Sequence, residues 1–463
     1  AAAYSSFRLY NPYTGGANGV GREQFANYTI PANLISPQAM NVLPYYPLPN
    51  SDRDLNSNQI ADDYLISRTQ YQHRDNYDLK LTYQRNQSHS IWAKFGMLDN
   101  EGTGDNFQLG FENPSLGDTR VYTGGIGHTW TLSPTLVLDG NFGYLQMNQT
   151  VTGPDYGTDF STELGIPGVN GPSERYTGLP MFDSNYDVGT TPSWMPLFRT
   201  EKNWTFSSAI TKVLPKHEIR AGFDFVRLEL NHYQAEFGPY GLKGGFAFSN
   251  NTTGAAGYTS PGWNNFAAFM LGLPNSYSKD FQEIQMTGRE NQFALYIRDR
   301  WNATEKLTLS LGLRMEIYPL MTRADSGIER LDLSTWTLLM GGRGDVPEDV
   351  GIDMQKLYFA PRVGAMYRLT EKSVIRAGYG RTINPLPWSR PMRGAYPYDV
   401  YLSATGETYG WATTLAQGIP GFTLPDLSTG RVQLKNWWAT FSTAIAPVQS
   451  IPVSARFAST ILP

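Results

Sequence analysis

One stretch, residues 307–318, constrains the fold of this chain more than any other. Apolar side chains occupy every odd position from Leu307 to Ile317, and Thr, Ser, Gly, Arg, Glu and Tyr hold the even positions. Successive side chains of a β-strand point to opposite faces, so this period of two predicts a strand with one apolar and one polar face. Residues 292–301 alternate in the same way, and the short link 302–306 between the two stretches predicts a β-hairpin.

The same alternation predicts four further hairpins, each closed by a short turn, which gives about ten clear strands. The rest of the barrel is expected to lie outside this sequence, or else some long connections contain further strands. The stretches pair as 77–83 with 91–97, 122–130 with 136–144, 204–210 with 219–225, and 363–369 with 375–379. We predict strands of about 9–12 residues, long enough to cross a bilayer when tilted and longer than the strands of globular sheets.

The connections between hairpins are long, at about residues 99–120, 148–202, 231–289 and 319–357, and are rich in Gly, Asn, Asp, Pro and aromatic residues. An up-and-down barrel with alternating short and long connections has all its tight turns at one rim and all its long loops at the other, as outer-membrane barrels do. Trp130 and Trp301 each precede a short turn, where an interfacial aromatic belt would lie. We therefore predict an all-β, antiparallel up-and-down transmembrane β-barrel, partial in this chain, with short periplasmic turns and long extracellular loops in the bacterial outer membrane.

The chain is expected to divide into four parts. Residues 1–70 form a loop-rich segment outside the cell, with one short helix that begins after the N-cap Ser36 and runs towards Leu43. The transmembrane hairpins and their long outer loops occupy residues 71–381. Residues 382–435 form a long loop rich in aromatic residues and proline, and residues 436–463 are an unassigned tail.

Composition excludes several other classes of protein. A formal net charge of −4 offers no basic field for nucleic acid, and the absence of cysteine excludes disulfides and thiolate metal sites. The longest apolar stretch, Phe266 to Leu273, is far shorter than the roughly 20 residues of a membrane-spanning helix. The first residues lack the features of a signal peptide, so any export signal is expected upstream of Ala1.

No set of residues predicts catalysis, a cofactor or a metal centre. The five histidines, His73, His89, His128, His217 and His232, lack the spacing of zinc sites. No phosphate-binding glycine loop or nucleophile elbow occurs, so we predict that the protein is not an enzyme.

Two charged features of the 319–357 connection have alternative interpretations. The acidic residues Asp345, Glu348, Asp349 and Asp353 offer oxygen ligands for a cation such as calcium, but their spacing matches no calcium loop and favours solvated charge. The tripeptide Arg343-Gly344-Asp345 has the sequence of a known cell-adhesion motif, but so short a motif also occurs by chance.

Two other groups of residues are candidates for ligand contact, although no ligand-binding residue is assigned. The aromatic loops Tyr176 to Trp194 and Trp388 to Tyr401 would stack on sugars or another flat ligand, or else pack on each other. On the polar strand faces, Arg298, Arg300, Arg314 and Glu316 are expected to line the lumen, and charge reversal would test whether they face a plug in a complete receptor.

Several short sequence motifs follow one another along the chain in an order that is typical of one protein family. Residues 9–15 read Leu-Tyr-Asn-Pro-Tyr-Thr-Gly, residues 30–37 read Ile-Pro-Ala-Asn-Leu-Ile-Ser-Pro, and residues 45–50 read Tyr-Tyr-Pro-Leu-Pro-Asn. The apolar segment 266–274, the hairpin 296–314 and the run 360–380 follow. Together they resemble the barrel region of Oar-like TonB-dependent receptors, and the likeness extends over about residues 5–435.

This resemblance implies a receptor that binds a scarce solute at the cell surface and imports it with energy from TonB. Such receptors have about 22 strands around a plug, and they contact TonB through an N-terminal segment, which would lie outside this sequence. The tail from about residue 436 does not resemble the family. A passive pore or an adhesion scaffold without energy coupling is the alternative function, and a soluble all-β binding or carbohydrate-active protein is a third.

Overall fold

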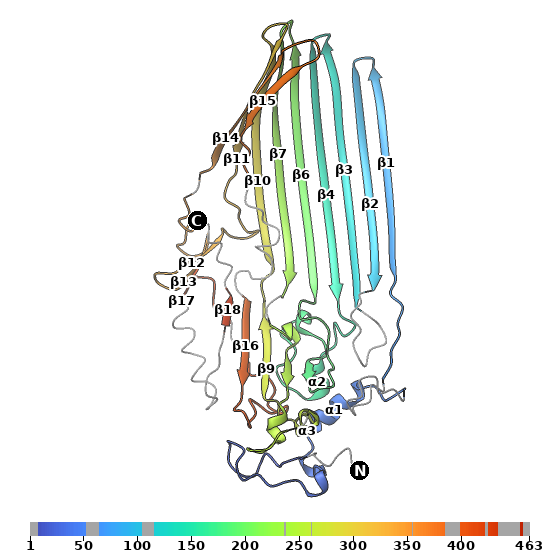
Figure 1. Cartoon of the computed structure of the whole chain (residues 1–463), viewed down its shortest axis with the longest axis vertical. Helices are drawn as coiled ribbons and strands as arrows, with labels where there is room; N and C mark the ends of the chain where they lie inside the picture. The colour runs from blue at the N-terminus through green and yellow to red at the C-terminus, as the bar shows by residue number, and fades with distance from the viewer. Residues whose placement is uncertain are drawn as a thin grey trace.

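Ten long strands form one antiparallel sheet in the computed structural model, which describes residues 8–51, 64–103, 115–235, 238–260, 262–353, 355–384, 399–421, 425–433 and 454–456. Their order is β1-β2-β3-β4-β6-β7-β10-β11-β14-β15 (Figure 1). The strands are β1 (Gln72–Asn86), β2 (His89–Thr103), β3 (Leu116–Ser133), β4 (Leu136–Thr152), β6 (Leu197–Val213), β7 (His217–Gln234), β10 (Met286–Asn302), β11 (Leu307–Ile317), β14 (Leu357–Arg368) and β15 (Val374–Gly380).

All five predicted hairpins are confirmed, and each pairs the stretches expected from the sequence. The five short turns lie together at one end of the sheet, and the long connections lie at the other (Figure 1). We call these the turn end and the loop end. The sheet is curved and open, with β1 and β15 as its edges.

Most of the strands are longer than predicted. β1, β2, β3, β4, β6, β7 and β10 have 15 to 18 residues, and only β11, β14 and β15 are shorter, with 12 residues or fewer. The expected 9–12 residues were therefore wrong for eight of the ten strands: seven are longer, and β15 is shorter with seven residues. The additional residues of the longer strands lie at the loop end, so the boundaries predicted for the loops at 99–120, 148–202 and 231–289 were also too wide.

The reason is that the alternation reverses its phase partway along a strand. On β7 the apolar residues Ile219 to Phe225 share one face, but that face continues with Arg227 and Glu229. The opposite face changes from the polar Arg220 and Asp224 to apolar residues, Val226, Leu228 and Leu230. β4 reverses in the same way, since its outer face changes from Phe142 and Tyr144 to Gln146 and Asn148, and its inner face from Asp139 and Asn141 to Leu145 and Met147. A strand predicted from one continuous alternation therefore ends where the alternation changes its phase, which is before the real end of the strand.

The turn-end half of the sheet has a continuous apolar outer face. Members include Leu79 and Leu81 on β1, Ile297 on β10 and Leu313 on β11, whose exposed fractions are 56%, 62%, 53% and 44%. On β10 the apolar band runs from Phe293 to Trp301, which is about 30 Å along a strand and about 23 Å across a bilayer at a tilt of roughly 40°. The band has the height of the lipid-facing belt of outer-membrane barrels.

The long connections fold into a second body at the loop end, which we call the loop domain (residues 8–51, 153–196, 235–285 and 399–421, with the gaps given above). Its sheet has the order β18-β16-β9-β8-β5, and β9, β16 and β18 are labelled in Figure 1. Phe160, Phe182, Phe246 and Phe269, from different connections, lie in one core and are almost completely buried. Its elements are α1 (Pro37–Val42), α2 (Phe160–Leu164), β5 (Met181–Asp183), β8 (Gly245–Ala247), α3 (Trp263–Met270), β9 (Ser276–Phe281), β16 (Asp399–Thr405) and β18 (Ser454–Arg456).

The short N-terminal helix is confirmed, because α1 begins after Ser36, whose side chain accepts a hydrogen bond from the N–H of Ala39. Arg22 fixes the N-terminal segment to the loop domain. Its guanidinium donates hydrogen bonds to the carbonyl oxygens of Thr252 and Gly254, both at 2.8 Å, and of Tyr409 at 2.6 Å.

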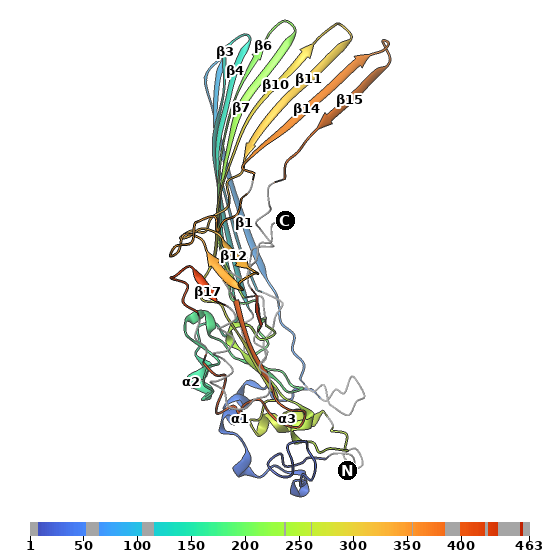
Figure 2. The ribbon, with the colours of Figure 1, turned by 90° about the vertical axis from the view of Figure 1, so that its left-hand side faces the viewer.

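Four of the predicted loops contain strands that were not predicted. Strand β5 lies in the connection 148–202, and β8 and β9 lie in the connection 231–289. The predicted loop 382–435 contains β16 and β17 (Arg431–Gln433), and the connection 319–357 contains β12 (Glu329–Asp332) and β13 (Thr337–Met340). β12, β13 and β17 form a separate sheet, and two of its strands, β12 and β17, are labelled in Figure 2. The strands in these loops have seven residues or fewer, which is too short to show a clear period of two, and β16 and β17 pair with strands far away in the sequence.

None of the helices in the described ranges has the length and apolar character that a membrane span requires. Most of the tail 436–463, and Trp388 with its neighbours, lie outside the described residues.

Candidate functional site

In the turn-end half of the sheet most charged side chains lie on the inner face. This face is concave from β7 to β15, where Arg220, Tyr296, Arg314, Arg362 and Gly380 line one trough of about 800 Å³. The paired register brings these residues to the same face, since Tyr296 lies opposite both Gly222 and Arg314. We call it the cationic trough.

Ion pairs across several strands hold part of this trough in place. The Arg314 guanidinium donates to the Asp224 carboxylate on β7 at 2.5 Å, over the intervening β10, and to Glu316 at 2.8 Å. The Arg220 guanidinium donates to the Asp139 carboxylate on β4 at 2.7 Å. Charge-assisted hydrogen bonds of this geometry fix side-chain positions, so these groups form a preorganised polar surface.

Other arginines on this face remain open to solvent. Arg298 is 56% exposed and lies 3.6 Å from Glu218, a long distance for an ion pair. Among the residues that the structure describes, Arg300 and Arg362 form no ion pair within 4.0 Å. The trough is therefore positively charged on balance, and it would attract anionic groups.

The aromatic ring of Tyr296 shapes the floor of the cationic trough. A Cβ atom at Gly222 would lie only 2.5 Å from the Tyr296 ring and hydroxyl, so the ring covers the backbone of the neighbouring strand there. The Arg314 guanidinium lies 5.8 Å from the centre of the same ring. Trp92 covers Gly127 on the inner face in the same way.

All four residues predicted to line the lumen are on the inner face, but they differ in how they are paired and exposed. Arg314 and Glu316 are bound to each other, whereas Arg298 forms only a long ion pair with Glu218 and is largely exposed, as is Arg300. The sequence analysis missed Arg220, Asp224 and Arg362, although they occupy the polar positions of strands that it had found. The same parity rule, applied to β7 and β14, would have identified them.

The two tryptophans predicted for an interfacial belt lie on the outer face at the turn end. Trp130 stacks on His89 with ring centres 5.1 Å apart, and Trp301 stacks on His217 at 5.6 Å. His217 also lies 2.7 Å from the Asp299 carboxylate. Within the described residues no group of histidine and acidic side chains could hold a metal ion.

The charged residues of the 319–357 connection engage one another. The carboxylate of Asp345 accepts hydrogen bonds from Arg431, and Arg343 pairs with Asp325 at 2.8 Å. Gly344 between them has a positive φ of 56° and packs on the backbone of Thr429. The adhesion-like tripeptide is thus a turn with both charged side chains in ion pairs.

The predicted aromatic loop from Tyr176 to Trp194 is divided between core and surface. Tyr176 is buried in the loop-domain core, and Tyr186 packs edge-on against Phe266 with ring centres 5.7 Å apart. Trp194 is half-buried beside the inner face of the sheet. Most of the other predicted loop, Trp388 to Tyr401, lies outside the described residues.

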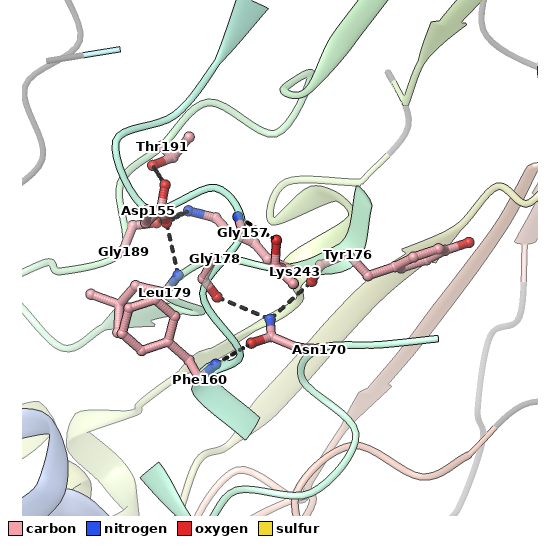
Figure 3. Close-up of polar contacts among 11 residues, drawn as sticks. Asp155, Gly157, Phe160, Asn170, Tyr176, Gly178, Leu179, Gly189, Thr191 and Lys243 are labelled. Carbon is pink, nitrogen blue, oxygen red and sulfur yellow. Dashed lines mark hydrogen bonds and ion pairs between the residues drawn. The ribbon is translucent and has the colours of Figure 1, made fainter. Parts of the chain in front are cut away.

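A hydrogen-bond network organises the connection between β4 and β6 (Figure 3). The amide of Asn170 accepts from the N–H of Phe160 at 2.6 Å and donates to the carbonyl oxygens of Tyr176 and Gly178, both at 2.9 Å. The Asp155 carboxylate accepts from the N–H of Leu179 at 2.7 Å. A loop has no neighbouring strand to satisfy its backbone N–H and C=O groups. In this connection side chains form those hydrogen bonds, which explains how so long a segment keeps one structure.

Two buried lysines fix the same region. The Lys243 ammonium donates to the carbonyl oxygen of Gly189 and lies 4.0 Å from the Asp155 carboxylate. The Lys279 ammonium donates to the carbonyl oxygen of Gly168 at 2.9 Å and lies over the Tyr176 ring. Burial lowers the pKa of Lys243 to about 8 and that of Lys279 to about 7.

These pKa values predict that the loop domain becomes more stable between pH 7 and pH 9. In the unfolded chain both lysines keep a pKa near 10.5, so over this range the unfolded state binds more protons than the folded state and the free energy of unfolding rises with pH. Each group contributes at most about 1.4 kcal/mol per pH unit. Hydrogen exchange of the loop-domain amides measures the slope, which K279M should reduce and K216M, at an exposed turn, should leave unchanged.

The rise in the free energy of unfolding is expected to end near pH 10, because the ionisation of tyrosines then lowers the stability of the folded state. Burial raises the pKa of Tyr277 to about 12. The unfolded chain ionises this residue at a lower pH than the folded protein does, which lowers stability above pH 10. Stability that is flat or falls from pH 7 to pH 9 would contradict the prediction.

Comparison with known proteins gives one match that spans nearly the whole chain. The sequence profile of a family described as "Outer membrane beta barrel domain" matches residues 1–458. A search of curated protein sequences found no match.

Solved structures with a similar course of the chain include three outer-membrane receptors. They are the alcaligin receptor FauA of Bordetella pertussis (10% identity, TM-score 0.35, 74% of this chain and 38% of that chain), the ferripyoverdine receptor of Pseudomonas aeruginosa (14%, 0.38, 74% and 40%) and the ferric preacinetobactin receptor BauA of Acinetobacter baumannii (11%, 0.34, 73% and 40%). The chain thus spans about two fifths of the length of each of these proteins.

Proposed function

Because the chain belongs to the outer membrane β-barrel domain family, we propose that it is the barrel portion of a TonB-dependent receptor of the Oar-like kind. In this proposal it binds a solute at the cell surface and takes part in its import. Its partners are outer-membrane lipid at the apolar belt, the solute at the loop end, and TonB through a segment outside this sequence.

The observation that carries the proposal is the division of the sheet into an apolar outer belt and a charged inner face, with a folded domain at the loop end. Exposed leucines, among them Leu81 and Leu313, fit lipid, and the ion pairs of Arg220 and Arg314 fit a solvated interior. Outer-membrane barrels have their long loops outside the cell, so the loop domain would meet the solute first.

A passive pore or an adhesion scaffold is the second candidate. It shares the belt and the inner face, but diffusion through a pore does not need a loop domain with its own hydrophobic core. Long loops that keep a defined structure are typical of recognition surfaces. The loop-domain core, with Phe182 and Phe246 almost completely buried, therefore favours a receptor.

Two measurements on the complete gene product, with any residues that flank this sequence, separate the candidates. We expect the protein, extracted from outer membranes in detergent, to be retained on an immobilised periplasmic domain of TonB, and to conduct little current in planar bilayers. The control is the same protein without the residues that precede Ala1, which should lose retention. Failure to bind TonB together with a steady open conductance would replace the receptor by the passive pore.

A further inference from the structure

A second hollow lies on the inner face of the sheet, at the loop end of β1 to β4. It has a volume of about 530 Å³, within the range of about 300–1,000 Å³ that small-ligand sites occupy. Asn100 on β2, Thr119 on β3 and Gln149 on β4 lie in one row across the strands, and Trp194 from the loop domain borders them. We call this hollow the neutral groove.

A pair of glycines lies at the floor of the groove. Gly102 and Gly117 face each other in the register of β2 and β3, next to the row of polar side chains. A Cβ atom at Gly117 would have no neighbour closer than 3.8 Å, so a side chain there would fit without strain and would project into the groove. At Gly102 a Cβ atom would lie 3.2 Å from the carbonyl oxygen of Tyr71, so it is the missing side chain of Gly117 that leaves the floor open.

In the part of the chain that the structure describes, none of the residues that line the groove is charged, in contrast to the cationic trough. Its polar groups are amides and hydroxyls, which both donate and accept hydrogen bonds. The Gln72 amide donates to the Asn100 side-chain oxygen at 2.8 Å, which orients the Asn100 amide and leaves its NH2 group as a donor. An ionic ligand would lose hydration here without meeting an opposite charge.

We propose that the neutral groove binds an uncharged oligosaccharide. Adjacent sugar hydroxyls both donate and accept, as the amides of Asn100 and Gln149 require, and the C–H face of a pyranose ring is an apolar surface for the Trp194 ring. A ligand without hydroxyls would leave the amides unpaired on binding, which is costly and gives selectivity.

The groove lies beyond the lipid belt, so water and solutes reach it. On β2 and β4 the outer apolar band ends near Met97 and Tyr144, and Asn100 and Gln149 lie several residues further towards the loop end. The site is thus on the inner side of the extramembrane part of the sheet. Its ligand class does not depend on energy coupling through TonB.

Titration calorimetry of the full chain in a detergent without a sugar headgroup tests this proposal. The probes are maltohexaose, cellohexaose and mannohexaose, with hexagalacturonate as a carboxylated comparison. We expect at least one neutral hexasaccharide to bind, and hexagalacturonate to bind at least tenfold more weakly. W194A removes the stacking surface and G117V fills the floor, and each should weaken the neutral sugar at least tenfold.

The control W336A removes a tryptophan that is 48% exposed and far from the groove in the sequence, and it should leave affinity unchanged. Because W194A removes a contact and G117V adds a side chain, a folding defect in one variant leaves the other to decide. The proposal is overturned if none of the three neutral sugars binds, if hexagalacturonate binds as well as they do, or if the folded variants keep the original affinity. TonB retention is a separate readout, so the two proposals can fail independently.

Discussion

Replacing Leu313 with arginine should destabilise the chain in a bilayer by about 2–4 kcal/mol, the cost of a basic side chain on the lipid face near the membrane midplane. Leu313 points outward, is 44% exposed, and lies opposite Ile297 near the middle of the apolar band. The guanidinium would be held in hydrocarbon with no hydrogen-bond partner and no counter-ion. Urea titration of the chain folded into lipid vesicles measures this loss.

The matched control is T205R, which places the same side chain on the inner face of β6, where Thr205 is exposed. We expect a change below about 1 kcal/mol, because the inner face is solvated and surface substitutions are usually tolerated. If T205R were as destabilising as L313R, or if L313R had no effect, the assignment of the outer face to lipid would be wrong.

Replacing Arg323 with methionine should destabilise the β12–β13–β17 sheet by about 3–5 kcal/mol, the usual cost of removing one partner from a buried ion pair. Arg323 and Glu329 form two hydrogen bonds with each other, and both side chains are fully buried. Arg323 also donates to the carbonyl oxygen of Thr287 on β10 at 2.6 Å. Without the guanidinium, the Glu329 carboxylate would be buried and unpaired.

Hydrogen exchange at the buried residues Leu338 to Met340 of β13 reads out this prediction locally. The control is the double variant R323M/E329M, which removes both charges and should recover most of the lost stability, since apolar replacements of a whole buried pair are often neutral. Equal protection in the single variant and the original chain would show that the pair contributes nothing to this sheet.

The ten strands and their five hairpins could be predicted because each is local. In the stretch from Leu307 to Ile317 one face meets lipid and the other meets an aqueous interior, so the sequence itself must alternate. The short turns are also local. Parity along the strands then places Arg298 and Arg314 inside without any knowledge of the tertiary structure.

Strand ends could not be predicted in the same way. Beyond Phe225 on β7 the environment changes, because the outer face leaves the membrane and the inner face begins to cover the loop-domain core. Arg227 and Leu228 therefore follow the reverse phase. The sequence does not show where a strand leaves the membrane. A strand whose alternation reverses at that point therefore looks like a strand followed by an irregular loop.

The candidate sites show the same limit. The ion pairs at the cationic trough involve Asp139, Asp224 and Arg314 from different strands. The neutral groove is lined both by Gly117 of β3 and by Trp194 of the connection between β4 and β6. Each residue has an ordinary sequence context. Only the register of neighbouring strands decides which side chains meet.

The sequence by itself determined the class of fold, the five hairpins of the long sheet and the faces of their strands, because these depend on near neighbours along the chain. The tertiary structure decided that the long connections share a folded domain and that the inner face holds one charged and one uncharged hollow. Those features arise from contacts between residues far apart in the sequence, such as Arg22 with Tyr409, and no local pattern encodes them.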